Sequence, residues 1–212
     1  MLLTPEQCAG FLSAALLITL SPGPDNLMVL SVGMARGRRQ GMAFGLGCAL
    51  GCLSHTILAA LGVSALLRAS PLAFTALKFA GGLYLVWLGI GALRSRGGTQ
   101  VAGEGAAALP EQALGRLFAK GLLANAINPK VVLFFLSFLP QFVIADRGDA
   151  SWQTAQLGLL FTAQGVLLFG LLGYFSGTVG SWINRHPRAG LWLDRGAGAI
   201  FVGLGVRLMV AR

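Results

Sequence analysis

Two charged residues, Asp25 and Lys130, stand inside stretches of sequence that are otherwise apolar. Each lies in a proline-containing break, which reads SPGPDN over residues 21–26 and NAINPK over residues 125–130. A charge at the centre of a membrane span costs about 2.5 to 3.5 kcal/mol on insertion scales, so a charge that is kept there has a partner or a task. The carboxylate and the ammonium group could pair with each other, or they could bind the two ends of a zwitterion.

The residues of the first break are of the types that begin a helix. Ser21 is expected to cap a new half-helix, with Pro22 at its first position. Pro24 still falls in the first turn, where a backbone N–H is not needed. Asp25 then lies beside the positive end of the half-helix dipole, which favours a carboxylate. Because the apolar run before the break covers only about half of the membrane, the new half-helix is predicted to begin inside the bilayer.

The second break repeats this arrangement, with Asn128 as the expected cap, Pro129 as the first helical residue and Lys130 directly after it. Backbone groups freed by such a break need protein groups or cavity water as partners. Two half-helix N-termini and Lys130 could attract a carboxylate, while Asp25 and unwound carbonyl groups receive an ammonium group. In the empty site Asp25 would pair with Lys130.

Several neutral or weakly basic side chains are expected close to the two breaks. Asn26, Asn125 and Gln141 could hydrogen-bond a ligand, and they could equally bind one helix to another. His55 could relay protons because imidazole titrates near neutral pH. A hydrogen bond from this lone histidine to a neighbouring helix is the simpler interpretation.

The composition indicates an integral membrane protein. The chain of 212 residues is 55% hydrophobic and 11% charged, and its mean hydropathy is +0.74, whereas a soluble domain carries about 25% charged residues. The length suits one transmembrane domain, residues 1–212. The net charge of +9 does not indicate nucleic-acid binding, because the basic residues lie in short loops between apolar runs rather than on an amphipathic face with aromatics.

Neither a cofactor nor a catalytic centre is predicted. Cys8, Cys48 and Cys52 match no ligand spacing for zinc or an iron–sulfur cluster and are interpreted as small apolar residues. No nucleophile, base and orienting partner stand at suitable places for hydrolysis. The first apolar segment lacks the basic start and the cleavage site of a signal peptide, so it is expected to remain in the protein.

Six apolar segments are interpreted as transmembrane helices, each of which needs about 20 residues. They are 11–30, 42–67, 72–93, 117–144, 157–174 with its flanks, and 191–210. The last contains Asp194, Arg195 and Arg207, which makes it the weakest of the six predictions. Small residues, chiefly the 31 glycines, would let these helices pack closely in lipid.

Basic residues predict the orientation, because short cytoplasmic loops are enriched in Lys and Arg. The first, third and fifth loops hold ten of them, namely Arg36, Arg38, Arg39, Arg94, Arg96, Arg116, Lys120, Arg185, Arg188 and Arg195. The other side holds five, namely Arg68, Lys78, Arg147, Arg207 and Arg212. Both termini are therefore expected on the periplasmic side.

A Gly/Ala-rich cytoplasmic loop, residues 97–115, divides the chain into halves of three segments each, about 1–96 and 116–212. With an odd number of spans per half, an internal repeat must be inverted in the membrane. The Ser-Pro of the first break matches the Asn-Pro of the second, and AGGLYLVWLG resembles AGAIFVGLGV, although chance similarity of glycine-rich stretches is an alternative. The expected fold is an all-α membrane protein of two inverted three-helix repeats, with helices 1 and 4 broken.

Two long stretches of the sequence carry a resemblance to a known family. They read SPGPDNLMVLSVGMARGRRQGMAFGLGCALG and GLLANAINPKVVLFFLSFLPQF, and they closely resemble the LysE/RhtB family of bacterial amino-acid exporters, whose members carry a Pro-Gly-Pro and an Asn-Pro-Lys motif. The resemblance covers nearly the whole chain. The motifs fall on Pro22, Gly23 and Pro24, followed by Asp25 and Asn26, and on Asn125, Asn128, Pro129 and Lys130.

The resemblance implies an inner-membrane secondary transporter that exports amino acids or close derivatives and uses the proton gradient. The candidate substrate-binding residues are Ser21, Gly23, Asp25, Asn26, Asn125, Asn128 and Lys130, the helix breaks are Pro22, Pro24 and Pro129, and the candidates for proton coupling are Asp25 and His55. The family does not fix which amino acid moves, the proton stoichiometry or the oligomeric state, and a homodimer stays open.

Two other membrane functions compete with this interpretation. A redox carrier built on inverted three-helix repeats would need a paired thiol with one cysteine in each half, but none follows Cys52. A metal-ion or other small-solute exporter is a closer rival. Ion binding would favour several acidic or histidine residues within the spans, and only Asp25 and His55 qualify.

Overall fold

The computed structural model describes residues 3–95, 110, 112–144 and 147–210, and within these residues every regular element is helical. This confirms the predicted all-α class. The connection predicted at 97–115 lies mostly outside the described residues.

The helices follow one another along the chain as α1 (Pro5–Leu20), α2 (Pro24–Arg36), α3 (Arg38–Ala69), α4 (Pro71–Leu93), α5 (Leu114–Ala126), α6 (Pro129–Leu133), η1 (Phe134–Phe138), η2 (Leu139–Phe142), α7 (Ala150–Tyr174), α8 (Ser176–Arg185) and α9 (Pro187–Val210). Of the two η elements, η1 is a π-helical turn and η2 a 3₁₀ turn. The side chains of Thr4, Ser70 and Asp149 accept backbone N–H groups and so cap α1, α4 and α7. The sequence did not predict α8.

The described helices include three that are long and apolar enough to cross a membrane alone, within α3, α4 and α7. Two further spans are bent pairs. The angle is 54° between α1 and α2, and 51° between α5 and the segment 129–142. Both predicted breaks are therefore present. The weakest predicted span forms the 24-residue helix α9, which is not among these candidates, so the count of six spans stays a prediction.

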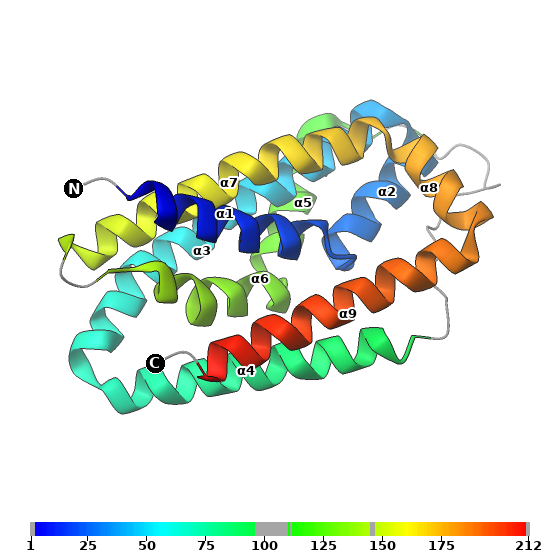
Figure 1. Cartoon of the computed structure of the whole chain (residues 1–212). Helices are drawn as coiled ribbons and strands as arrows, with labels where there is room; N and C mark the ends of the chain where they lie inside the picture. Colours follow the sequence, from blue (N-terminus) through cyan, green and yellow to red (C-terminus); the bar gives the residue numbers. More distant parts are fainter. Residues whose placement is uncertain (1–2, 96–109, 111, 145–146, 211–212) are drawn as a thin grey trace.

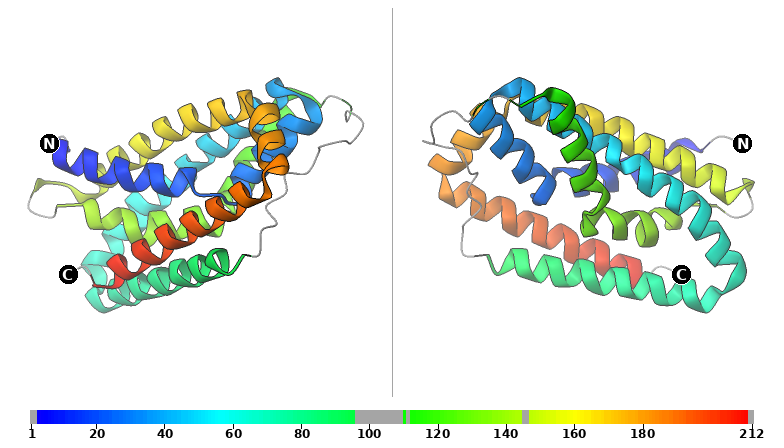
Figure 2. Two further views of the ribbon diagram at one scale, coloured as in Figure 1. Left: turned by 45° about the vertical axis from the view of Figure 1, so that its right-hand side comes forward. Right: turned by 180° about the vertical axis from the view of Figure 1, so that it is seen from behind.

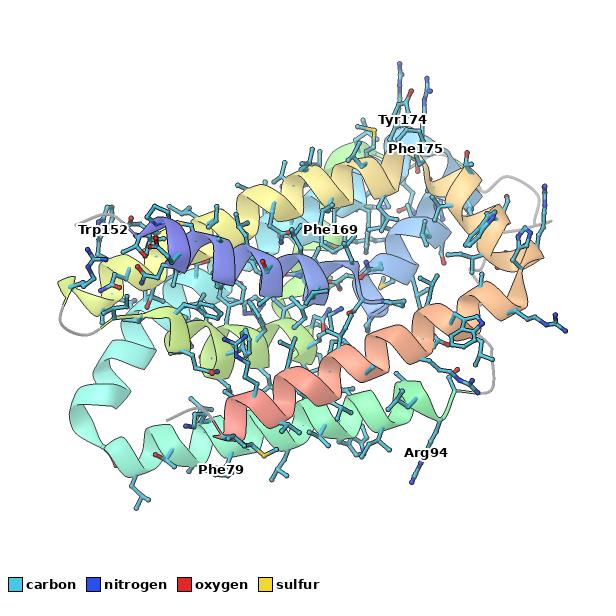
Figure 3. All side chains as sticks on the ribbon, viewed as in Figure 1. Phe79, Arg94, Trp152, Phe169, Tyr174 and Phe175 are labelled. Atoms are coloured by element: carbon cyan, nitrogen blue, oxygen red, sulfur yellow. The ribbon has the colours of Figure 1, made fainter. Side chains whose placement is uncertain are left out.

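The two chain ends lie at the same end of the helical bundle (Figures 1 and 2). The turns from α2 to α3 and from α7 to α8 lie at the opposite end. Side chains mark the same two ends in Figure 3, with Trp152 at the first and Tyr174 and Phe175 at the second. The connections predicted to be cytoplasmic at 36–39 and 175–188 are thus on one end, away from both termini.

Close pairs of helices hold the bundle together, with α3 packed along α5 and α7, and α4 along α9. At Gly89 of α4 and Gly198 of α9, a methyl group would come within 2.7 Å of the other glycine's carbonyl oxygen. At Gly47 of α3 and Gly121 of α5, it would overlap the backbone of the facing helix. Such close approach of the backbones stabilises helix packing in a membrane, where no hydrophobic driving force brings helices together. At these four positions the predicted architectural role of glycine is confirmed.

Candidate functional site

The first break runs from Ser21 to Gly23, between α1 and α2. The prediction that Ser21 caps the new half-helix is wrong, because Gly23 is the N-cap residue and Pro24, not Pro22, is the first residue of α2. The Ser21 hydroxyl instead donates to the carbonyl oxygen of Leu17 at 2.7 Å. A serine hydroxyl that bonds back by four residues belongs to the helix it ends rather than to the one that follows.

The second break is built as predicted. The side-chain oxygen of Asn128 accepts a hydrogen bond from the backbone N–H of Lys130 at 3.0 Å, so Asn128 caps α6, and Pro129 is its first residue. After five α-helical residues the chain passes into the π-helical turn η1. Turns of this kind are frequent at functional sites, because they shift the register of the side chains that follow.

The side chain of Lys130 reaches from the second break to the first. Lys130 is buried, and its ammonium group donates to the carbonyl oxygen of Ser21 at 3.0 Å. Gly23 leaves room for this approach, because a methyl group there would lie 2.8 Å from Lys130 Nζ. The ammonium group also lies 5.4 Å from the ring centre of Phe201 on α9, within the range of a cation–π contact.

Asn125, the first residue of the second break, holds the carboxylate of the first break. Its Nδ2 atom donates to Asp25 Oδ2 at 2.7 Å, and both residues are buried, with exposed fractions of 1% and 4%. The pairing expected between Asp25 and Lys130 is therefore not what the structure shows. Each charge is held by a neutral group from the other break, since Asn125 bonds Asp25 and Ser21 bonds Lys130.

Two residues of α3 join the same network through Asn125. His55 Nε2 lies 3.1 Å from the Asn125 carbonyl oxygen. This is the hydrogen bond to a neighbouring helix that the sequence favoured as the simpler interpretation of His55. His55 lines a separate cavity of about 80 Å³. The thiol of Cys52 donates to Asn125 Oδ1 at 3.4 Å and lines the central cavity, so the interpretation of Cys52 as a mere apolar residue missed this polar contact.

Asp25 and Lys130 line one cavity of about 20 Å³. A cavity of this size holds about one water molecule, so an amino acid would enter only when the site opens. The polar lining consists of Thr19, Asp25, Asn26, Asn125, Asn128 and Lys130, and the remaining lining of Ile18, Cys52, Val131, Phe134, Phe161 and Phe169. Five of the seven candidate substrate-binding residues thus meet at one place. Ser21 and Gly23 lie behind Lys130 instead.

A polar chain beside the first break was not predicted. The side chain of Asn26 donates to the Thr19 carbonyl oxygen at 2.9 Å, which ties α2 back to α1. The Thr19 hydroxyl accepts from Gln164 Nε2 of α7 at 2.9 Å. Among the described residues, Gln164 Oε1 is the buried side-chain atom without a hydrogen-bond partner. A polar amide in the middle of the apolar segment 157–174 was the signal that could have identified Gln164.

A cluster of aromatic rings borders the cavity. Phe134 and Phe161 line the cavity, with their ring centres 5.2 Å apart. Phe11 and Phe135 pack against these two rings, with centre distances from 5.1 to 6.5 Å. Ring pairs at such distances are well packed, so an aromatic cluster borders the cavity on this side.

Gln141 lies outside this arrangement. Gln141 belongs to η2, and its side chain donates to the carbonyl oxygen of Ser137 at 3.3 Å, rather than reaching either break. The described part of the chain contains no group of three or more His, Cys, Asp or Glu residues that could hold a metal ion.

Comparisons with known proteins match nearly the whole chain. The sequence model of the LysE type translocator family matches residues 16–212. An uncharacterized membrane protein of Pseudomonas aeruginosa is 35% identical over 195 residues, which cover 92% of this chain and 90% of the relative. The threonine efflux protein of Escherichia coli is 30% identical, over 91% and 92% of the two chains. The homoserine/homoserine lactone efflux protein of Salmonella typhimurium is 28% identical, over 99% of both. No solved structure matches.

Proposed function

The chain belongs to the LysE type translocator family, and we propose that it is a secondary transporter that exports amino acids or close derivatives across the bacterial inner membrane. Two of its relatives are named for the efflux of threonine and of homoserine and its lactone. The observation that carries the proposal is the meeting of an acidic and a basic side chain, from two broken helices, at one buried cavity.

The cavity offers complementary groups to the two ends of an amino acid. The ammonium group of Lys130, together with the N-terminal turns that follow the two breaks, attracts the substrate carboxylate. The carboxylate of Asp25 receives the substrate ammonium group. Since Asn125 bonds Asp25 and Ser21 bonds Lys130, a zwitterion can insert between the two charges without first breaking a direct ion pair. The amides of Asn26 and Asn128 line the same cavity.

The two broken spans supply the moving parts for alternating access. Each break interrupts one span, and the two charges come from different halves of the chain, 1–96 and 116–212. The pairing of α3 with α7 and of α4 with α9 joins corresponding segments of these halves, which supports the proposed inverted repeat. Rocking or opening of the two broken segments, α1–α2 and α5–α6, against the paired helices would expose the cavity first to the cytoplasm and then to the periplasm, the side on which we place both termini.

Asp25 is also the carboxylate through which we propose proton coupling. A proton that enters from the periplasm would neutralise Asp25 and release the substrate ammonium group outward. Export against a concentration gradient should therefore stop when a protonophore collapses the proton gradient, while equilibration down the gradient continues. Export that persists uphill under these conditions would contradict the coupling but not the transport.

An export assay tests the function. Cells that overproduce the protein would be loaded with amino acids by feeding dipeptides, and the amino acids released to the medium would be quantified without choosing one in advance. We expect wild-type cells to release at least one amino acid faster than cells without the protein. Asp25→Asn and Lys130→Met should return this release to background, because each removes one of the two charges that bind the zwitterion.

The controls separate loss of the site from loss of the protein. Lys120→Met removes a lysine from the exposed face of α5, where the ammonium group bonds Gln112, and should leave export unchanged. The amount of each variant in the membrane would be measured by immunoblotting. Normal export by Asp25→Asn or Lys130→Met at normal protein level would show that the proposed site is wrong.

A further inference from the structure

A second hollow adjoins the central cavity. It lies between the end of α1, α7 and α8, and its volume is about 260 Å³ against about 20 Å³ for the central cavity. Its walls are formed by Leu20, Leu168, Leu171, Leu172, Phe175 and Val179. We call this hollow the α7–α8 groove. Among its lining residues there is no charged side chain.

The groove and the central cavity share part of their walls. Thr19, Asn26 and Phe169 line both of them, and Thr19 and Asn26 are the polar residues at the inner end of the groove. In Figure 3, Phe169 lies midway along the bundle and Phe175 at the end remote from the termini. The groove therefore extends from the residues that it shares with the central cavity towards the end that we place in the cytoplasm, while the cluster of aromatic rings borders the central cavity as well.

We propose that the α7–α8 groove binds the side chain of the exported molecule and restricts it to amino acids, or derivatives, whose side chain is apolar. This inference rests on the proposed function, since it assumes that the charged end of the substrate lies between Asp25 and Lys130. The head group then fills the polar cavity once it opens, and the side chain occupies space that is already present. Burial of apolar surface there contributes about 25 cal/mol per Å² to affinity.

The lining explains which side chains are excluded. A lysine or glutamate side chain would place its charge among leucine and phenylalanine residues with no partner, and an unpaired charge in apolar surroundings is strongly disfavoured. A membrane lipid is the competing occupant, because Leu20, Leu171 and Phe175 are exposed at the rim. The groove adjoins the cavity lined by Asp25 and Lys130, and its inner end is polar. Both features favour the substrate over a lipid acyl chain, which is apolar along its whole length.

Filling the groove tests the inference. Leu168→Trp adds bulk inside the groove from α7, and Val179→Phe does so from α8. Leu167→Trp is the matched control, because Leu167 is the next residue on the same helix but is 62% exposed and does not line the groove. Cells loaded with equal amounts of leucine, methionine, phenylalanine, alanine, lysine and glutamate would be compared for the release of each.

The pattern of release decides the outcome. We expect the wild type and Leu167→Trp to release the large apolar amino acids about tenfold faster than lysine or glutamate, a discrimination that apolar pockets commonly reach. Leu168→Trp or Val179→Phe should abolish the release of the large apolar amino acids and spare alanine.

Two results would overturn the inference. One is equal release of lysine by the wild type. The other is an unchanged release profile in both filling variants when they are inserted in the membrane, as expected for a groove filled by lipid. A uniform loss in both inserted variants would do the same. Release of no amino acid by the wild type would instead overturn the proposed function.

Discussion

The two broken helices bend by nearly the same angle, 54° and 51°, but they are built from different residues. The first has a glycine cap with no side-chain hydrogen bond and continues as the regular helix α2 of 13 residues. The second has an asparagine cap and continues as five α-helical residues, a π-helical turn and a 3₁₀ turn. The two breaks therefore have the same bend, but the residues and the capping hydrogen bonds that form them differ.

The chemical difference is complementary. The first break supplies a carboxylate and a backbone carbonyl group, and the second supplies an ammonium group and an amide. Lys130 donates to Ser21, and Asn125 donates to Asp25, so each break holds the charge of the other. A symmetric pair of breaks with two acids or two bases would repel, whereas this pair presents one pole to each end of a zwitterion.

The largest effect is expected at Asn125, the residue of the second break whose side chain bonds Asp25 of the first break. Asn125→Ala removes the donor to Asp25 and leaves a buried carboxylate without this partner. Hydrogen bonds to charged groups are worth about 1.5 to 3 kcal/mol, so we expect a loss of stability in that range and loss of export. Thermal unfolding of the purified protein and the export assay would measure the two effects. Retention of both would show that Asn125 does not hold the acidic pole.

The cap of the second break should have a smaller effect. Asn128→Ala removes an N-cap, which costs about 1 kcal/mol, and frees the start of α6 next to Lys130. Asn128→Ser keeps a capping oxygen and should restore stability. Thermal unfolding of the three proteins would measure this order. Equal stability of the alanine and serine variants would contradict the role of the Asn128 side chain as a cap.

The smallest effect is expected at the glycine of the first break. Gly23 has an extended backbone, with φ of −163°, so alanine fits the backbone and acts only through its methyl group, 2.8 Å from Lys130 Nζ. We expect Gly23→Ala to weaken substrate binding by about 1 kcal/mol, a factor of about five. Calorimetry would measure this loss. In a Lys130→Met background, where export is already at background, adding Gly23→Ala should not change thermal unfolding, and a further loss of stability there would contradict contact through Lys130.

The sequence alone located both breaks, because proline and capping residues inside apolar runs are local signals. It identified Asn128 as a cap for the same reason. It placed the first cap incorrectly, because Ser21 could either end α1 or begin α2, and only the folded chain shows its bond to Leu17. Local pattern cannot choose between two helices that compete for one hydroxyl group.

Other parts of the site depend on helices that are distant in the sequence. Gln164 comes to Thr19 from α7, and Phe201 comes to Lys130 from α9. Their proximity follows from the packing of the helices. This packing depends on close contacts at glycine residues and cannot be predicted from the hydrophobic periodicity of the sequence. The bonds of Asp25 and Lys130 to neutral partners were unexpected for the same reason, since charge alone predicts that opposite charges pair.

The most direct measurement is the binding of three related ligands to the purified protein by calorimetry. These are the amino acid identified by the export assay, its methyl ester, which lacks the carboxylate, and its N-acetyl derivative, which lacks the ammonium group. We predict that the wild type binds only the zwitterion, that Lys130→Met no longer prefers the amino acid over its ester, and that Asp25→Asn no longer prefers it over the N-acetyl derivative. If each variant kept the wild-type preference for the zwitterion, the two breaks would not form the poles of a substrate site.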